Sequence, residues 1–110
     1  RTGVAMLGGL FKSGRIDAFA HALADELAPR LSAAAGGARA SRDGVKQMER
    51  LFAEAESRAI AFSRELRLGV YGKARLCNSL RWRLTEQGAD ATLLATAMER
   101  IVAAVSRDRG

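Results

Sequence analysis

Apolar side chains recur along most of the chain at spacings of three and four residues, which is the period of an α-helix with one buried face. The clearest run is a heptad-like seam that continues for three repeats and comprises Val45, Met48, Phe52, Ala55, Ala59, Phe62 and Leu66. Valine, isoleucine and threonine nowhere alternate with polar residues as they would in a half-buried strand. The pattern predicts an all-α, single-domain bundle of four main helices, at about residues 15–30, 43–67, 72–87 and 90–107.

Residues that break or cap helices predict where these elements end. Pro29 has no amide hydrogen and its ring crowds the carbonyl of Asp25, so the first helix should end or kink near Ala28. Gly69 suits the left-handed position that closes a helix, because it has no Cβ. Asp90 suits the N-cap of the last helix, since its carboxylate can accept a hydrogen bond from a free amide of the first turn.

The remaining segments complete the domain organisation. Residues 1–14 are predicted to form an irregular or loosely helical N-terminal segment that leads into a single helical domain at residues 15–110. Residues 32–42 are small and polar and contain two glycines, so we expect them to form the longest loop. A chain of 110 residues can bury one core without disulfides or metal ions.

Composition narrows the class of protein. Apolar residues make up 48% of the chain and charged residues 27%, a balance typical of a folded globular domain. No apolar run approaches the length that spans a bilayer. The single cysteine, Cys77, excludes an intramolecular disulfide and fits a reducing compartment, so we expect a cytoplasmic protein.

The third predicted helix has the most distinctive surface. At 100° per residue, Tyr71, Arg75, Asn78 and Trp82 fall in one stripe. The opposite, inner face is predicted to comprise Val70, Ala74, Leu76, Cys77, Leu80 and Leu84. Tryptophan, tyrosine and arginine often dominate binding hot spots, so the stripe is a candidate partner-binding face. The alternative is that both rings pack against another part of the chain, as a lone tryptophan in a small domain usually does.

Positive charge is concentrated in the same helix. The chain carries a formal charge of +6, and residues 70–89 contain four basic residues and one acid. The four basic residues are Lys73, Arg75, Arg81 and Arg83. Concentrated cations suit phosphate contacts, which makes nucleic-acid binding an alternative function. These side chains point in different directions around the helix, however, and the preceding turn lacks the spacing of a helix-turn-helix.

Catalytic or metal chemistry has little support in the sequence. The only histidine, His21, lies four residues from both Asp17 and Asp25, and such an arrangement usually forms a solvated, salt-bridged helix face. Cys77 is predicted to be a small buried side chain rather than a nucleophile. We therefore expect no enzymatic activity, no cofactor and no metal site.

The sequence as a whole favours a small non-catalytic helical binding module. We expect a protein partner at a basic and aromatic face made of Tyr71, Lys73, Arg75, Asn78, Arg81, Trp82 and Arg83, with DNA or RNA as the alternative partner. A homodimer is a further alternative, because Ala55 and Ala59 would let a helix of a second copy approach closely. Packing within the chain is sufficient to cover that seam, however.

Overall fold

The computed structural model describes the backbone of residues 2–35 and 42–108, and side chains within residues 12–33 and 42–108. This part of the chain forms four helices: α1 (Thr2–Ala35), α2 (Arg42–Leu66), α3 (Val70–Glu86) and α4 (Ala91–Arg107). The prediction of an all-α bundle of four main helices is confirmed, and the bounds of α2, α3 and α4 lie within two residues of those predicted. None of the helices described is long and apolar enough to cross a membrane.

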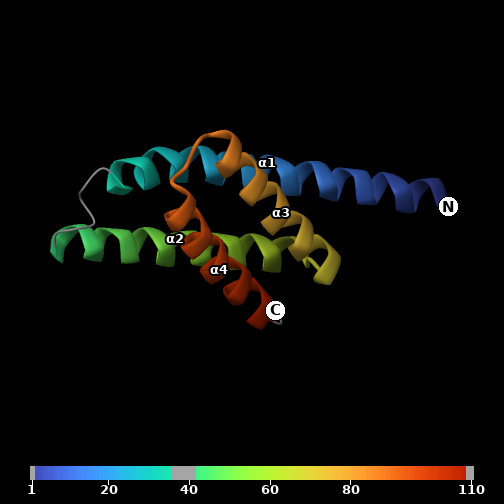
Figure 1. The fold of residues 1–110 in the computed structure, drawn as a ribbon. Coiled ribbons are helices and arrows are strands. Elements are labelled where there is room, and N and C mark those ends of the chain that lie inside the picture. Colours follow the sequence, from blue (N-terminus) through green and yellow to red (C-terminus); the bar gives the residue numbers. More distant parts are fainter. Residues whose placement is uncertain (1, 36–41, 109–110) are drawn as a thin grey trace.

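The helices form an elongated bundle in which α3 lies along α1 and α4 packs on both α2 and α3 (Figure 1). The principal extents are 57 × 27 × 16 Å, and the radius of gyration is 15.0 Å. A compact chain of this length has a radius of gyration of about 13 Å. The N-terminal turns of α1 extend beyond the ends of the other helices (Figure 1), which contributes to this elongation.

One core runs through the bundle. Leu76, Leu80 and Leu84 of α3 have no exposed surface, as predicted for the inner face of that helix. The seam of α2 also packs within the chain, because Ala55 and Ala59 are 2% and 0% exposed. The small side chains of the seam are therefore covered by helices of the same chain, and they offer no open surface for a second copy.

Two aromatic contacts hold α2 against its neighbours. The ring of Phe62 stacks on Phe19 of α1 with a centroid separation of 4.2 Å and an interplanar angle of 5°. On the other side, the guanidinium of Arg100 in α4 lies 5.1 Å from the ring centroid of Phe52. Arg100 also pairs with two acids of α2, Glu49 at 2.5 Å and Glu56 at 2.7 Å.

The first helix is longer than the sequence pattern predicted. It begins at Thr2 rather than near residue 15, and it continues through Pro29 to Ala35. Proline removes one backbone hydrogen bond in a helix interior, but Leu31 beyond it is fully buried, so packing offsets the loss. The predicted loop at residues 32–42 is therefore shortened by helix at both ends, and residues 36–41 lie outside the described part of the chain.

The turn between α2 and α3 differs from the prediction in the residue that closes α2. Arg67, not Gly69, adopts the left-handed conformation, with φ at 52°. The amide of Arg67 donates to the carbonyl of Arg64 (3.2 Å) and the amide of Leu68 to that of Ser63 (2.9 Å), the bond pattern of a Schellman motif. Leu68 must follow immediately because its side chain, 6% exposed, enters the core. Gly69 instead occupies the N-cap position of α3, with φ at −85°.

The predicted N-cap of α4 is confirmed. The carboxylate of Asp90 accepts a hydrogen bond from the amide of Leu93 at 3.1 Å and caps α4. Gly88 follows α3 with φ at 77°, the left-handed conformation that glycine adopts without strain.

Candidate interaction face on helix α3

The aromatic side chains of α3 lie on the surface. Tyr71 is 91% exposed and Trp82 is 68% exposed, and Asn78 between them is also exposed. The alternative in which both rings pack inside the bundle is therefore wrong. The reason is topological: α1 and α4 pack on the two flanks of α3, and the face between these flanks is left open to solvent.

Arg75 belongs to the same stripe by sequence, but it is anchored to α1. Its Nε and Nη2 donate to the two carboxylate oxygens of Asp17 at 3.2 and 2.8 Å. Ser79, one turn further along α3, donates to the same carboxylate at 2.8 Å. The hydrogen bond from Arg75 lowers the pKa of Asp17 below its ordinary value.

The same arrangement recurs two turns along both helices. Arg83 donates to Asp25 through Nε at 3.1 Å and through Nη2 at 3.5 Å, and Gln87 donates to the same carboxylate at 2.7 Å. The hydrogen bond from Arg83 lowers the pKa of Asp25. Because Asp17 meets the first half of α3 and Asp25 meets its end, α1 and α3 run in the same direction. This polar edge holds α3 against α1 at a fixed rotation.

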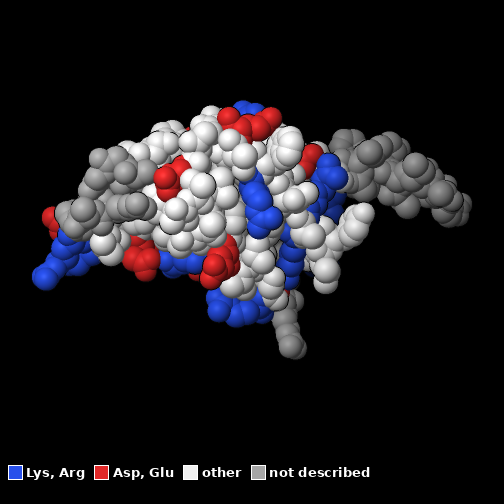
Figure 2. All heavy atoms as spheres, in the orientation of Figure 1, with Lys and Arg blue, Asp and Glu red and all other residues white. Residues whose placement is uncertain are grey.

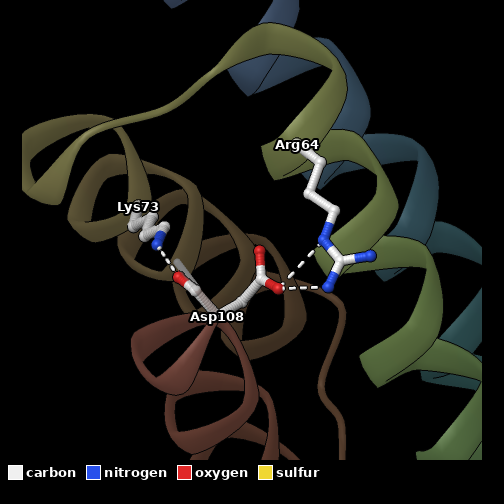
Figure 3. Close-up of polar contacts among 3 residues, drawn as sticks. All are labelled: Arg64, Lys73 and Asp108. Carbon is white, nitrogen blue, oxygen red and sulfur yellow. Dashed lines mark hydrogen bonds and ion pairs between the residues drawn. The ribbon is translucent and has the colours of Figure 1, made fainter. Parts of the chain in front are cut away.

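Lys73 is held at the opposite edge of α3, where three helices meet (Figure 3). Its Nζ donates to the main-chain carbonyl of Asp108 at 2.6 Å. The carboxylate of Asp108 accepts from Nε and Nη2 of Arg64 in α2 at 2.9 and 2.6 Å, and this hydrogen bond lowers the pKa of Asp108. The side chain of Asp108 is only 7% exposed, so the end of α4 is fastened to α2 and α3 together.

Arg81 differs from the other basic residues of α3. It is exposed, and its side chain has no hydrogen bond or ion pair with any of the residues that the structure describes. Of the seven predicted partner-binding residues, the open face thus keeps Tyr71, Asn78, Arg81 and Trp82. The remaining three, Lys73, Arg75 and Arg83, are bound to groups of the same chain, although Arg75 stays half-exposed.

An apolar groove adjoins this face between α3 and α4. Its volume is about 280 Å³, and it is lined by Val70, Lys73, Ala74, Cys77, Val102, Val105 and Ser106. Val70 and Ala74 were predicted to lie on the inner face, but both are exposed, Val70 at 88%. Val70 is the first residue of α3 and extends past the core. The contribution of α4 to the groove was not predicted, since the sequence does not show which helix packs beside α3.

Charged groups are unevenly distributed over this side of the molecule. Figure 2 shows uncharged atoms over much of the α3–α4 face, with a basic group near its middle and further acidic and basic groups around it.

Cys77 and the two aspartates beside His21, which were considered for catalysis or metal binding, are buried or bonded within the chain. Cys77 is buried, as predicted, and burial raises the pKa of its thiol, so little thiolate is present at neutral pH. Asp17 and Asp25, which flank His21, are bonded to α3 as described above. Within residues whose side chains are described, no cluster of three or more His, Cys, Asp or Glu side chains could hold a metal ion.

Comparison with known proteins adds no assignment: the chain matches no known family, no curated protein and no solved structure.

Proposed function

We propose that this chain is a non-catalytic protein-interaction module that binds its partner through the outer face of α3. The observation that carries the proposal is the exposure of Tyr71 and Trp82, at 91% and 68%, on one face of a helix that is anchored along both edges. Burying two such rings against a partner removes a large apolar area from water. Because α3 is already held in place, binding would order few additional groups.

The polar residues of the face define the chemistry of the partner. Arg81 supplies a positive charge that no described group of the chain neutralises, and Asn78 supplies an amide between the two rings. The α3–α4 groove beside them is mainly apolar. These features favour a partner surface that presents apolar or aromatic side chains together with a carboxylate.

The engagement of the other basic residues makes nucleic acid the weaker candidate. Arg75 and Arg83 are paired with carboxylates, and Lys73 donates to a carbonyl beside the Asp108 carboxylate. A phosphate backbone would have to compete with these contacts, and among the four basic residues of α3 only Arg81 has a side chain without a described partner. Several neutralised phosphates are needed for substantial affinity, so the face favours protein over DNA or RNA.

Site-specific photocrosslinking in cells of the native host tests the proposal. A benzophenone amino acid at position 78, in the centre of the face, is expected to give a defined protein adduct. The same probe at Thr96, an exposed polar residue of α4, serves as the matched control. Tyr71→Ala combined with Trp82→Ala should reduce the adduct at position 78 at least tenfold, as expected for the loss of hot-spot rings. Equal labelling at the two positions would contradict the proposal.

A second measurement separates protein from nucleic-acid binding. Fluorescence-polarisation titrations with mixed DNA and RNA at low and high salt should show no binding that requires Arg81. A steep loss of affinity with salt, together with weaker binding of Arg81→Ala, would instead support the nucleic-acid alternative.

A further inference from the structure

The four stripe residues on α3 have the same spacing when they are counted from either end of the helix. Tyr71, Arg75, Asn78 and Trp82 are separated by four, three and four residues, so the midpoint of the stripe lies between residues 76 and 77. A twofold axis perpendicular to α3 at that midpoint would place Tyr71 beside Trp82 of a second copy, and Arg75 beside Asn78 of that copy. Each contact would occur twice, which is the property of an isologous interface.

We propose that the partner of this face is a second copy of the chain, paired through α3 and α3 in antiparallel orientation. This inference rests on the proposed function, since it names the partner of the same surface. It concerns a face other than the seam of α2, whose small residues are buried within the chain.

The chemistry of the paired positions supports the antiparallel arrangement. Two aromatic rings that meet across the axis can stack in an offset or edge-to-face geometry. The stripe arginines approach the amides of Asn78 rather than each other, and each is already paired with Asp17. A parallel pairing would instead place Arg75 beside its own copy, with like charges in contact.

The ends of α3 are also complementary in this orientation. The first turn of α3 contains no acid, and its N-cap, Gly69, offers no side-chain acceptor. Unpaired amides and the helix dipole make this end partly positive, and the exposed Arg67 lies just before it. The antiparallel register brings the exposed Glu86 of the second copy, from the last turn of its α3, to this end. This contact pairs the Glu86 carboxylate of one copy with the positive N-terminal end of α3 in the other copy, and it occurs twice in the dimer.

The size of the interface sets the expected strength. One pair of helices buries less than the roughly 800 Å² per partner of a standard stable interface. A weak, reversible dimer is therefore expected, with a dissociation constant on the order of 10–100 µM.

Sedimentation velocity of the full chain over a concentration series that spans this range tests the proposal. Tyr71→Glu and Trp82→Lys, each alone, should weaken the dimer at least tenfold, because each removes both copies of the ring pair. Both positions are exposed, so the variants should fold, and circular dichroism verifies this.

An equimolar mixture of the two variants tests the orientation. In the antiparallel heterodimer, one contact is the native ring pair and the other joins the introduced carboxylate at position 71 to the introduced amine at position 82. The mixture should therefore dimerise more strongly than either variant alone. In a parallel dimer, position 71 faces position 71 and position 82 faces position 82. Mixing would then remove the like-charge pairs of the two variants but would form neither the native ring pair nor an ion pair, so the mixed dimer would stay weaker than the antiparallel pairing predicts.

The matched control is Val45→Glu, which adds a charge at an apolar residue that is 52% exposed on α2 and should leave dimerisation unchanged.

A wild-type chain that stays monomeric throughout the series would overturn the inference, as would a dimer that the variants at positions 71 and 82 do not affect. Failure of the mixture to recover would overturn the antiparallel pairing. In each case, an adduct from position 78 to a different protein would still support the proposed function, whereas loss of that adduct would remove the proposed function as well.

Discussion

Arg67 and Gly88 occupy equivalent positions after α2 and α3. Both adopt positive φ angles, 52° and 77°, and both are followed by an amide that reaches back to close the helix, from Leu68 to Ser63 and from Ala89 to Leu84. Glycine adopts this conformation freely, whereas a Cβ meets the neighbouring carbonyl oxygen at a cost of about 1 kcal/mol. Two turns of similar geometry therefore differ in strain because of one side chain each.

This difference yields a prediction for two reciprocal substitutions. Arg67→Gly should raise the free energy of unfolding by up to about 1 kcal/mol, because it relieves the left-handed strain. Gly88→Ala should lower it by about 1 kcal/mol. No described atom outside Gly88 and its two neighbouring residues lies within 4 Å of the added Cβ, so the effect is conformational. Urea denaturation of both variants measures the two changes. A destabilised Arg67→Gly variant would contradict this account.

At the residue scale, the sequence predicted which side chains share a stripe but not what each one contacts. The helical period alone placed Tyr71, Asn78 and Trp82 on one face. The bonds from Arg75 to Asp17 join residues 58 positions apart. A local pattern does not contain that proximity, because it depends on α3 lying parallel to α1. For the same reason, the sequence could not separate Arg81 from the other arginines.

At the scale of the element, α1 shows how packing overrides a local break. Pro29 is exposed and lies between the buried Leu27 and Leu31, so the helix must continue to keep both leucines in the core. Of the two outcomes predicted near Ala28, an end or a kink of the helix, the end is contradicted, because α1 continues to Ala35. The propensity of one residue was outweighed by the apolar face of the whole helix.

Pro29→Ala is accordingly predicted to stabilise the protein. It restores the amide that can donate to the carbonyl of Asp25, and no buried contact of the ring is lost. The expected gain is about 1–3 kcal/mol, reduced in part by the greater freedom of the unfolded chain. Ser32→Ala, also exposed in α1, is the matched control and should gain only about 0.5 kcal/mol. Thermal unfolding compares the two, and equal shifts would show that Pro29 imposes no particular penalty.

The seam of α2 illustrates a prediction that the bundle confirmed. Its spacing indicated a buried face, and Phe52, Ala55, Ala59, Phe62 and Leu66 are buried. Val45, at the start of the seam, is half-exposed, since it lies near the end of the bundle. A regular apolar period therefore specifies the direction of burial well, and the extent of burial less well at helix ends.

At the scale of the whole molecule, three aspartates connect the helices through bonds to arginines. Arg75, Arg83 and Arg64 lower the pKa values of Asp17, Asp25 and Asp108, respectively, below the ordinary value of 3.8. A carboxyl group with a lowered pKa in the folded state stabilises the fold above its unfolded pKa. That contribution is lost as the pH falls through the folded pKa.

The protein should therefore lose stability as the pH falls below about 4. A variant with Asp17→Asn and Asp25→Asn should be less stable than wild type at neutral pH. The difference should shrink towards zero in acid, where the wild-type carboxyls are protonated as well. Chemical denaturation at a series of pH values measures this convergence. A difference that stays constant with pH would show that these ion pairs do not contribute to stability.

The elongated form of the bundle has a hydrodynamic consequence. A particle measuring 57 × 27 × 16 Å experiences more friction than a sphere of the same mass, so it diffuses slowly and elutes early from a gel-filtration column. A single chain would then be assigned too high an apparent mass if it were calibrated against spherical standards. Light scattering, which reports mass independently of shape, gives the correct count of chains in such a particle.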